Sequence, residues 1–370
     1  MSHLDSITEL RKLLRAPGLG ILTLSSGGRH ARSLLAKVYG HDRSLDSAIN
    51  QWETELDRIA SAKTVLLGIP SDTGSSIARG SNFGPIGVRQ AYFSMFGQFP
   101  GDVLDLGDVV VVPQLLHDSM YSPGLISDVH RKLYGDESLD LPVSPLSIAR
   151  RVTELVLKEN PGVRIAMLGG DHGNSRPILE ALCEQYSDEL AVLQIDAHTD
   201  LSEDRFGVEY CYNTWANHVA RLIPGKIVQI GIRATIKTKK QWMREQPVFQ
   251  IWKHELNDSN AVDLVLETLG SLNASKLYIT NDIDATDPKY APATGTAAEG
   301  GFHPAFVKNI VNQAIQNFDV IGGDVVEVAP CLGDEPFHKI SFETDITCRL
   351  GAEYLHELLT KNEGSMGSIR

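Results

Sequence analysis

Cysteine is scarce in this chain of 370 residues. There are four, widely spaced and without a CxxC pair: Cys183, Cys211, Cys331 and Cys348. This pattern is neither a disulfide framework nor a zinc knuckle. We expect free or buried thiols in a reducing compartment, and therefore a cytoplasmic location.

Basic residues and long apolar runs are also lacking. The chain has 34 Lys and Arg against 47 Asp and Glu, a formal net charge of −13, which argues against nucleic acid or anionic membranes as partners. No apolar run is long enough to span a bilayer. The first residues lack the apolar stretch of a secretory signal peptide.

Acids are missing from residues 10–41, which contain six basic residues. A basic, acid-poor start can be an organellar transit peptide, but Asp5 and Glu9 precede it, and transit peptides avoid acids. We therefore expect residues 1–62 to be an N-terminal extension with an amphipathic arm lying on the surface. A transit peptide is the alternative.

Short apolar, β-branched runs recur after residue 63, with helical patterns between several of them. Continuous apolar strands that alternate with helices indicate a parallel sheet covered on both faces. We predict a three-layer α/β/α fold with a mainly parallel central sheet. The predicted strands are 64–69, 103–106, 163–168, 190–195, 227–232, 277–283 and 319–326, and the predicted helices are 44–62, 147–159, 175–186, 261–271 and 304–317.

This pattern places one main domain over residues 63–361. Residues 112–145 lack clear periodicity and are rich in Pro, Ser, Gly and Asp, so we expect an insertion there that is either a functional loop or disordered. Residues 362–370 are predicted to be a flexible tail.

Acids and histidines concentrate in three motifs at the C-terminal ends of predicted strands, where ligand sites of open α/β sheets lie. Side chains two residues apart on a strand point to one face. Asp196, His198 and Asp200 can therefore converge, and so can Asp282 and Asp284. Burying so many carboxylates without compensating charge is very costly, so the pattern predicts bound metal ions.

The third motif is Gly169-Gly170-Asp171-His172. Its glycines allow a tight turn that can aim the imidazole of His172 inward. Imidazole and carboxylate together suit Mn, Zn, Fe, Co or Ni, and the number of ligands is large enough for two ions. Glu327 ends another apolar strand and can hold a cationic substrate beside a metal pair. A salt bridge at the edge of the sheet is its structural alternative.

At these residues the chain resembles the ureohydrolase superfamily of arginases and agmatinases. The resemblance covers about residues 64–355. It rests on GGDH, on DAHTD and on TNDIDATDP, together with flanking segments, at 169–172, 196–200, 280–288, 68–72, 80–85 and 292–301. It implies an arginase/deacetylase-like fold, with 63–361 as the catalytic domain, and a homotrimer or homohexamer.

The resemblance also implies roles for individual residues. One divalent ion would be held by His172, Asp196, Asp200 and Asp282, and the other by Asp196, His198, Asp282 and Asp284. Manganese is the favoured metal and nickel the alternative. Asp200 would accept a proton and pass it to the leaving amine, and Glu327 would pair with the guanidinium group of the substrate.

The chain departs from the family pattern after Asp200. Arginases and agmatinases usually carry a His-Gly segment there that serves as proton shuttle or substrate contact. Here Tyr212 or Asn213 stands near that place as a candidate substrate contact, and His218 is the fallback catalytic histidine. The Ser/Asn-rich stretch by which arginases hold the amino-acid end of arginine is also absent, so arginine is disfavoured.

The expected function is hydrolysis of a guanidino C–N bond in a small cationic substrate, agmatinase-like, releasing urea and an amine. Glu203, Asp204 and Glu209 would suit the cationic tail of agmatine, although they can equally be solvated loop acids. The alternatives are a hydrolase of guanidine itself or of another small guanidino or formimino compound, and a metal-binding family member without catalysis.

Overall fold

The computed structural model describes residues 4–22, 28–40, 44–136, 139–256, 260–333, 335 and 339–360. Its centre is a nine-stranded sheet with the strand order β1-β3-β2-β4-β9-β8-β5-β6-β7. β1 runs antiparallel to β3, and the other neighbours are parallel. The strands are β1 (Leu14–Arg15), β2 (Thr64–Ile69), β3 (Val103–Val109), β4 (Arg164–Gly169), β5 (Leu190–Ile195), β6 (Ile227–Ile232), β7 (Val248–Trp252), β8 (Lys276–Asp282) and β9 (Asp319–Val326).

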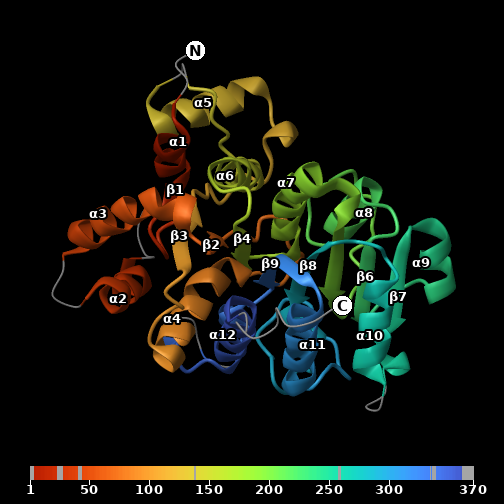
Figure 1. Ribbon diagram of the computed structural model, residues 1–370. Helices are drawn as coiled ribbons and strands as arrows, with labels where there is room; N and C mark the ends of the chain where they lie inside the picture. The colour runs from red at the N-terminus through yellow and green to blue at the C-terminus, as the bar shows by residue number, and fades with distance from the viewer. Residues whose placement is uncertain are drawn as a thin grey trace.

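Helices cover both faces of this sheet (Figure 1). They are α1 (Ser6–Leu13), α2 (Gly28–Tyr39), α3 (Leu45–Glu55), α4 (Gly84–Phe96), α5 (Pro123–Tyr134), α6 (Pro145–Glu159), α7 (Ser175–Tyr186), α8 (Trp215–Leu222), α9 (Lys239–Glu245), α10 (Ala261–Gly270), α11 (Pro304–Asn317) and α12 (Ile346–Leu359). The predicted tail, 362–370, lies outside the described residues.

Alternate residues of the strands enter two separate cores. Val65 and Leu67 of β2 pack into the cluster on the side of α6, α7 and α8. Leu66 packs into the cluster on the side of α4, α11 and α12. Strands buried on both faces are nearly continuous apolar runs, which is why β2, β5 and β6 are recognisable in the sequence. The three-layer α/β/α prediction is confirmed.

The N-terminal region packs the apolar side of α1 into the main core. The side chains of Leu10 and Leu13 in α1 are fully buried, because β1 pairs with β3 at the sheet edge and α1 lies against α6. The backbone N–H of Gly18 donates a 2.8 Å hydrogen bond to Asp108 Oδ2. The partly exposed Arg11 and Lys12 lie beside this inward-facing apolar stripe, so α1 is amphipathic.

The segment 112–145 contains a helix that the sequence analysis did not predict. α5 begins after Ser122, whose hydroxyl accepts the N–H of Leu125, and has Pro123 in its first turn. It ends at Gly135, which adopts a left-handed φ of 69°. Serine, proline and glycine at these positions are standard helix-boundary signals, so this helix was detectable. Because few of its side chains are buried, this helix lacks the apolar periodicity by which we predicted the other helices.

Candidate metal centre

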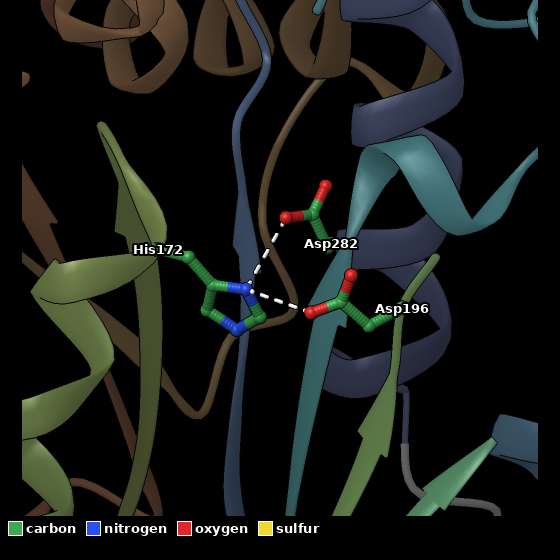
Figure 2. Close-up of side chains that lie close together, drawn as sticks. All are labelled: His172, Asp196 and Asp282. Atoms are coloured by element: carbon green, nitrogen blue, oxygen red, sulfur yellow. Dashed lines mark ion pairs between the residues drawn. The ribbon is translucent and has the colours of Figure 1, made fainter. Parts of the chain in front are cut away.

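His172 faces several carboxylates inside the protein, and two of them, Asp196 and Asp282, are drawn in Figure 2. Its Nδ1 lies 3.1 Å from Asp196 Oδ2, 3.1 Å from Asp200 Oδ2 and 3.2 Å from Asp282 Oδ2. His172 follows β4, Asp196 and Asp200 follow β5, and Asp282 ends β8. The carboxyl ends of these strands meet at one edge of the sheet, so the three sequence motifs come together there as predicted.

A hydrogen-bond chain fixes the tautomer of His172. Thr280 Oγ1 donates to Asp324 Oδ1 at 2.7 Å, so it can only accept from His172 Nε2, which lies 2.8 Å away. Neutral His172 therefore carries its proton on Nε2 and directs the lone pair of Nδ1 at the carboxylates. This Nδ1 is buried and has no hydrogen-bond partner. Metal-ligating histidines are oriented by the same kind of outer contact, so the arrangement fits a cation.

A second group of possible ligands shares Asp196 with the first. Asp196, His198 and Asp284 offer ligand atoms within 4.8 Å of one another. His198 Nδ1 lies 2.9 Å from Asp284 Oδ2 and 3.7 Å from Asp196 Oδ1. One oxygen of Asp196 thus faces each histidine, as a carboxylate shared between two ions would require.

The ligands converge for a different reason from the one we predicted. β5 ends at Ile195, so Asp196, His198 and Asp200 lie beyond the strand and do not follow its alternation. Asp200 instead adopts a left-handed φ of 50°, and its Oδ2 accepts a 2.8 Å hydrogen bond from Trp215 Nε1. Such a backbone conformation costs energy for a non-glycine residue and is concentrated at functional sites.

The glycines before His172 also act differently from the prediction. Gly170 does not have a positive φ. A Cβ at this position would lie 2.0 Å from the carbonyl oxygen of Ser71. The glycine is needed because two chain segments pass this closely, and the contact seats the His172 loop against the loop that follows β2.

The protein itself supplies too little positive charge for these acids. Burial, followed by the charges of Asp284 and Asp196, raises the pKa of Asp282 well above its usual value. Burial by itself would lower the pKa of His198, but Asp284 and Asp196 outweigh it and raise this pKa to about 12. The cluster therefore attracts cations or protons, and divalent ions would neutralise it most effectively.

Glu327 lies beside the same cluster. Its Oε1 accepts the backbone N–H of His172 at 2.9 Å, and its φ is 62°. A Cβ added at Gly295 would lie 3.8 Å from Glu327 Oε2, so the loop that carries Gly295 passes close to this oxygen. Burial, followed by the charges of Asp282 and Asp171, raises the pKa of Glu327 well above its usual range. The structure thus brings Glu327 to the site and not to a salt bridge at the sheet edge.

A pocket of about 320 Å³ opens between the loops that follow β2 and β5. Tyr212 lines it, and the backbone N–H of Tyr212 donates to Gly74 O at 3.2 Å. Burial, followed by Asp200, raises the pKa of the Tyr212 hydroxyl. Asn213 does not line this pocket; its amide reaches Ser202 Oγ at 3.4 Å. Of the two candidate substrate contacts, the structure favours Tyr212.

His218 does not join the cluster. Its Nδ1 lies 2.9 Å from Nη2 of Arg176, which can only donate, and its Nε2 lies 2.8 Å from Glu180 Oε1. Both ring nitrogens are therefore engaged between α7 and α8. A proton shuttle needs a nitrogen free to exchange protons with substrate, so the structure argues against His218 as the catalytic histidine.

Trp215 contacts the cluster in a way that the sequence did not predict. It is fully buried, donates to Asp200 as described, and its ring centroid lies 4.7 Å from that of His172. A tryptophan fifteen residues after Asp200 carries no motif of its own. Only the fold, which starts α8 beneath the DAHTD loop, brings it to the site.

Comparison with known proteins identifies the family. The model of the Arginase family matches residues 62–360. The chain belongs to the arginase family. The predicted membership of the ureohydrolase superfamily is therefore confirmed, and so is its class as a hydrolase of C–N bonds in linear amidines. Enzymes of this family typically depend on two metal ions, and the buried His and Asp groups described above could hold them.

Two curated members of the family are similar in sequence to this chain. An agmatinase from Bacillus cereus is 32% identical over 276 residues, which cover 73% of this chain and 84% of the relative. A guanidinobutyrase from Pseudomonas aeruginosa is 28% identical over 320 residues, covering 84% and 88%.

Two solved structures share the fold of this chain. Proclavaminate amidino hydrolase from Streptomyces clavuligerus is 26% identical, with a TM-score of 0.62 and coverage of 80% of this chain and 90% of that one. A hypothetical agmatinase from Burkholderia thailandensis is 25% identical with a TM-score of 0.61, covering 81% and 86%. None of the helices in the described part of the chain combines the length and apolar character of a membrane span.

Proposed function

We propose that this protein hydrolyses the guanidino C–N bond of a small guanidino compound with the help of two divalent cations. One observation carries the proposal. A buried histidine nitrogen without a hydrogen-bond partner faces three carboxylates, and one of these carboxylates also belongs to a second potential ligand group. This arrangement is unfavourable without cations and well suited to two of them.

The ligands in this proposal are those that the family resemblance implied. They are His172, Asp196, Asp200 and Asp282 for one ion, and Asp196, His198, Asp282 and Asp284 for the other. When bound, the cation pair supplies Lewis-acid activation of water and makes hydroxide available near neutral pH. Manganese is the favoured metal and nickel the alternative, because both tolerate this set of nitrogen and oxygen ligands.

The remaining steps belong to side chains of the protein. Asp200 takes up the proton of the attacking water and delivers it to the leaving amine. Trp215 keeps Asp200 in place through its 2.8 Å hydrogen bond. Glu327, held by the N–H of His172, pairs through its other oxygen with the planar guanidinium group. The pocket beside Tyr212 receives the rest of the substrate.

The pocket favours an uncharged or anionic substrate tail. Glu203 and Asp204, which suggested agmatine, do not line it: Glu203 pairs with Arg221 at 2.8 Å, and Asp204 accepts the N–H of Gly207. Arg205 does line it. A guanidino acid, as in the name of the guanidinobutyrase relative, therefore fits better than agmatine, the substrate named in the other relative.

The test is a panel of guanidine, agmatine, 4-guanidinobutyrate and arginine, scored for urea and ammonia. The protein is reconstituted with Mn²⁺ and with Ni²⁺ in separate series, and the Asp284→Ala variant serves as the control. We expect urea from 4-guanidinobutyrate in preference to agmatine and arginine. If only guanidine is hydrolysed, with equal release of urea and ammonia, the protein is a guanidine hydrolase and the guanidino-acid assignment is wrong. Absence of urea from every compound would refute the proposed enzyme.

A further inference from the structure

Three buried glutamines form a ladder that crosses strands β7, β6 and β5 towards the metal centre. Gln250, Gln229 and Gln194 are direct neighbours in the strand register, and their exposed fractions are 4%, 0% and 0%. Gln250 Nε2 donates to Gln229 Oε1 at 2.7 Å, and Gln229 Nε2 donates to Gln194 Oε1 at 2.6 Å. Gln194 Nε2 then donates to Asp196 Oδ2 at 2.7 Å.

The two ends of this amide ladder determine its direction. The indole Nε1 of Trp252, which can only donate, lies 3.1 Å from Gln250 Oε1. At the other end the ionised carboxylate of Asp196 can only accept. Turning any one amide over would place two oxygens or two N–H groups face to face. All three amides therefore point their N–H groups towards Asp196.

The second hydrogens of the amides also hold the ligand loop. Gln229 Nε2 lies 2.6 Å from the carbonyl oxygen of Thr199. Gln194 Nε2 makes a longer contact, 3.5 Å, with the carbonyl oxygen of His198. The ladder thus contacts the backbone of the DAHTD loop as well as one of its carboxylates. A loop without regular secondary structure needs such contacts to keep its ligands in place.

The geometry points to the amide ladder as a positioning device for Asp196, the carboxylate shared by the two proposed cations; this inference rests on the proposed function. Gln194 occupies one lone pair of Oδ2, and the N–H of His198 occupies one of Oδ1 at 2.6 Å. One lone pair of each oxygen remains for a cation. Aligned hydrogen bonds polarise one another, so residues on the edge strand β7 influence a ligand that they do not touch.

The experiment titrates metal-free protein with Mn²⁺ by calorimetry, with a parallel Ni²⁺ series. Gln194→Leu removes the direct donor, and we expect affinity to fall roughly 10- to 100-fold, as for other outer contacts of metal ligands. Gln250→Leu is expected to lower affinity about three- to tenfold, and Trp252→Phe about twofold, because cooperative strengthening decreases along the chain. Substrate KM should stay constant, and kcat should recover at saturating metal.

Gln90→Leu is the matched control. Gln90 is also a buried glutamine, 2% exposed, and its amide donates to the carbonyl oxygen of His30. It lies on α4, outside the ladder, so it should lose stability without losing Mn²⁺ affinity. Melting curves of all variants distinguish misfolding from weakened metal binding. Trp252→Phe keeps an aromatic ring at this position, so it still tests the ladder if a glutamine variant does not fold.

Two results distinguish this inference from the proposed function. If the wild type binds both ions and Gln250→Leu and Trp252→Phe bind them equally well, the ladder does not transmit and the inference is wrong. If the wild type binds neither metal, the proposed function is refuted, and with it the role of the ladder in positioning a metal ligand.

Discussion

Two clusters of ionisable side chains in this protein differ in how their buried acids are compensated. The Glu180 cluster, between α6, α7 and α8, consists of Glu180, Arg150, Arg176 and His218. Glu180 receives hydrogen bonds from Arg150 at 2.8 Å and Arg176 at 2.9 Å, and its Oε1 lies 2.8 Å from His218 Nε2. Burial raises its pKa, but these three partners outweigh burial and lower the pKa to about 2.

In the candidate metal centre, the cationic partners of the carboxylates among the described residues are all histidines. Four aspartates surround two histidines there, and the pKa of Asp282 is raised by burial and by its acidic neighbours. Glu180 and Asp282 are both buried carboxylates, 7% and 3% exposed, but in the described part of the chain only Glu180 has arginine partners. The difference teaches that a buried acid becomes informative about function when the chain does not supply its counter-charge. On this criterion the Glu180 cluster is structural, and the other cluster is prepared for added cations.

The largest expected effect is the loss of a ligand from the uncompensated cluster. Asp284→Ala and His198→Ala should each lower turnover by about a thousandfold or more and reduce bound metal, because the activated water loses one of its cations. Turnover and metal content per chain are measured together. Full activity in either variant would show that the ligand assignment is wrong.

A matched pair of isosteric changes tests the comparison itself. Glu180→Gln should destabilise the protein by about 2 kcal/mol, because Arg176 stays buried without its counter-charge. Asp282→Asn should stabilise the metal-free protein by about 1 kcal/mol, because it removes one of several crowded charges. Thermal or urea unfolding gives both values. The same sign in both variants would break the distinction between the two clusters.

Much of this account could be predicted from sequence, because fully buried parallel strands and their loop motifs are local patterns. The predicted run 190–195 coincides with β5, and the helix 304–317 with α11. The gathering of His172 with the DAHTD loop also follows from strand order at one sheet edge. β7 was missed because Phe249 is 40% exposed and the strand lies at the edge of the sheet.

The rest depends on contacts between distant segments. Trp215 reaches Asp200, and Gln250 reaches Asp196 through two other glutamines, only because the sheet register aligns them. The engagement of His218 by Arg176 and Glu180 likewise has no signature in the spacing of the residues. The fallback choice of His218 rests on residue type and proximity in sequence alone.

The comparison of charged side chains also applies to an arginine side chain at the substrate pocket. Arg205 lines the pocket, and its guanidinium lies over the ring of Phe206 at 5.4 Å, so we expect it to pair with an anionic tail. Arg205→Gln should raise KM for 4-guanidinobutyrate about tenfold, as expected for loss of one charge-assisted hydrogen bond, and leave KM for guanidine unchanged.

Arg221→Gln is the control, since Arg221 already pairs with Glu203. An equal rise in KM for both substrates in Arg205→Gln would indicate a general distortion of the loop and not recognition of the tail.

The smallest expected effect is the acid sensitivity of the compensated cluster. The pKa of Glu180 is about 2 in the folded protein against an ordinary 4.5, so its contribution to stability is complete above about pH 4.5 and is lost as pH falls towards 2. The stability difference between wild type and Glu180→Gln should therefore shrink as pH falls through this window. A constant difference would mean that the charge of Glu180 does not stabilise the fold.

The central claim is that the acids around His172 require cations from outside the chain. Equilibrium dialysis of the metal-free protein against Mn²⁺ and Ni²⁺, followed by elemental analysis, tests it most directly. We expect two bound ions per chain in the wild type, and two in Glu180→Gln, which leaves the metal centre intact. One ion or none per wild-type chain would contradict the central claim.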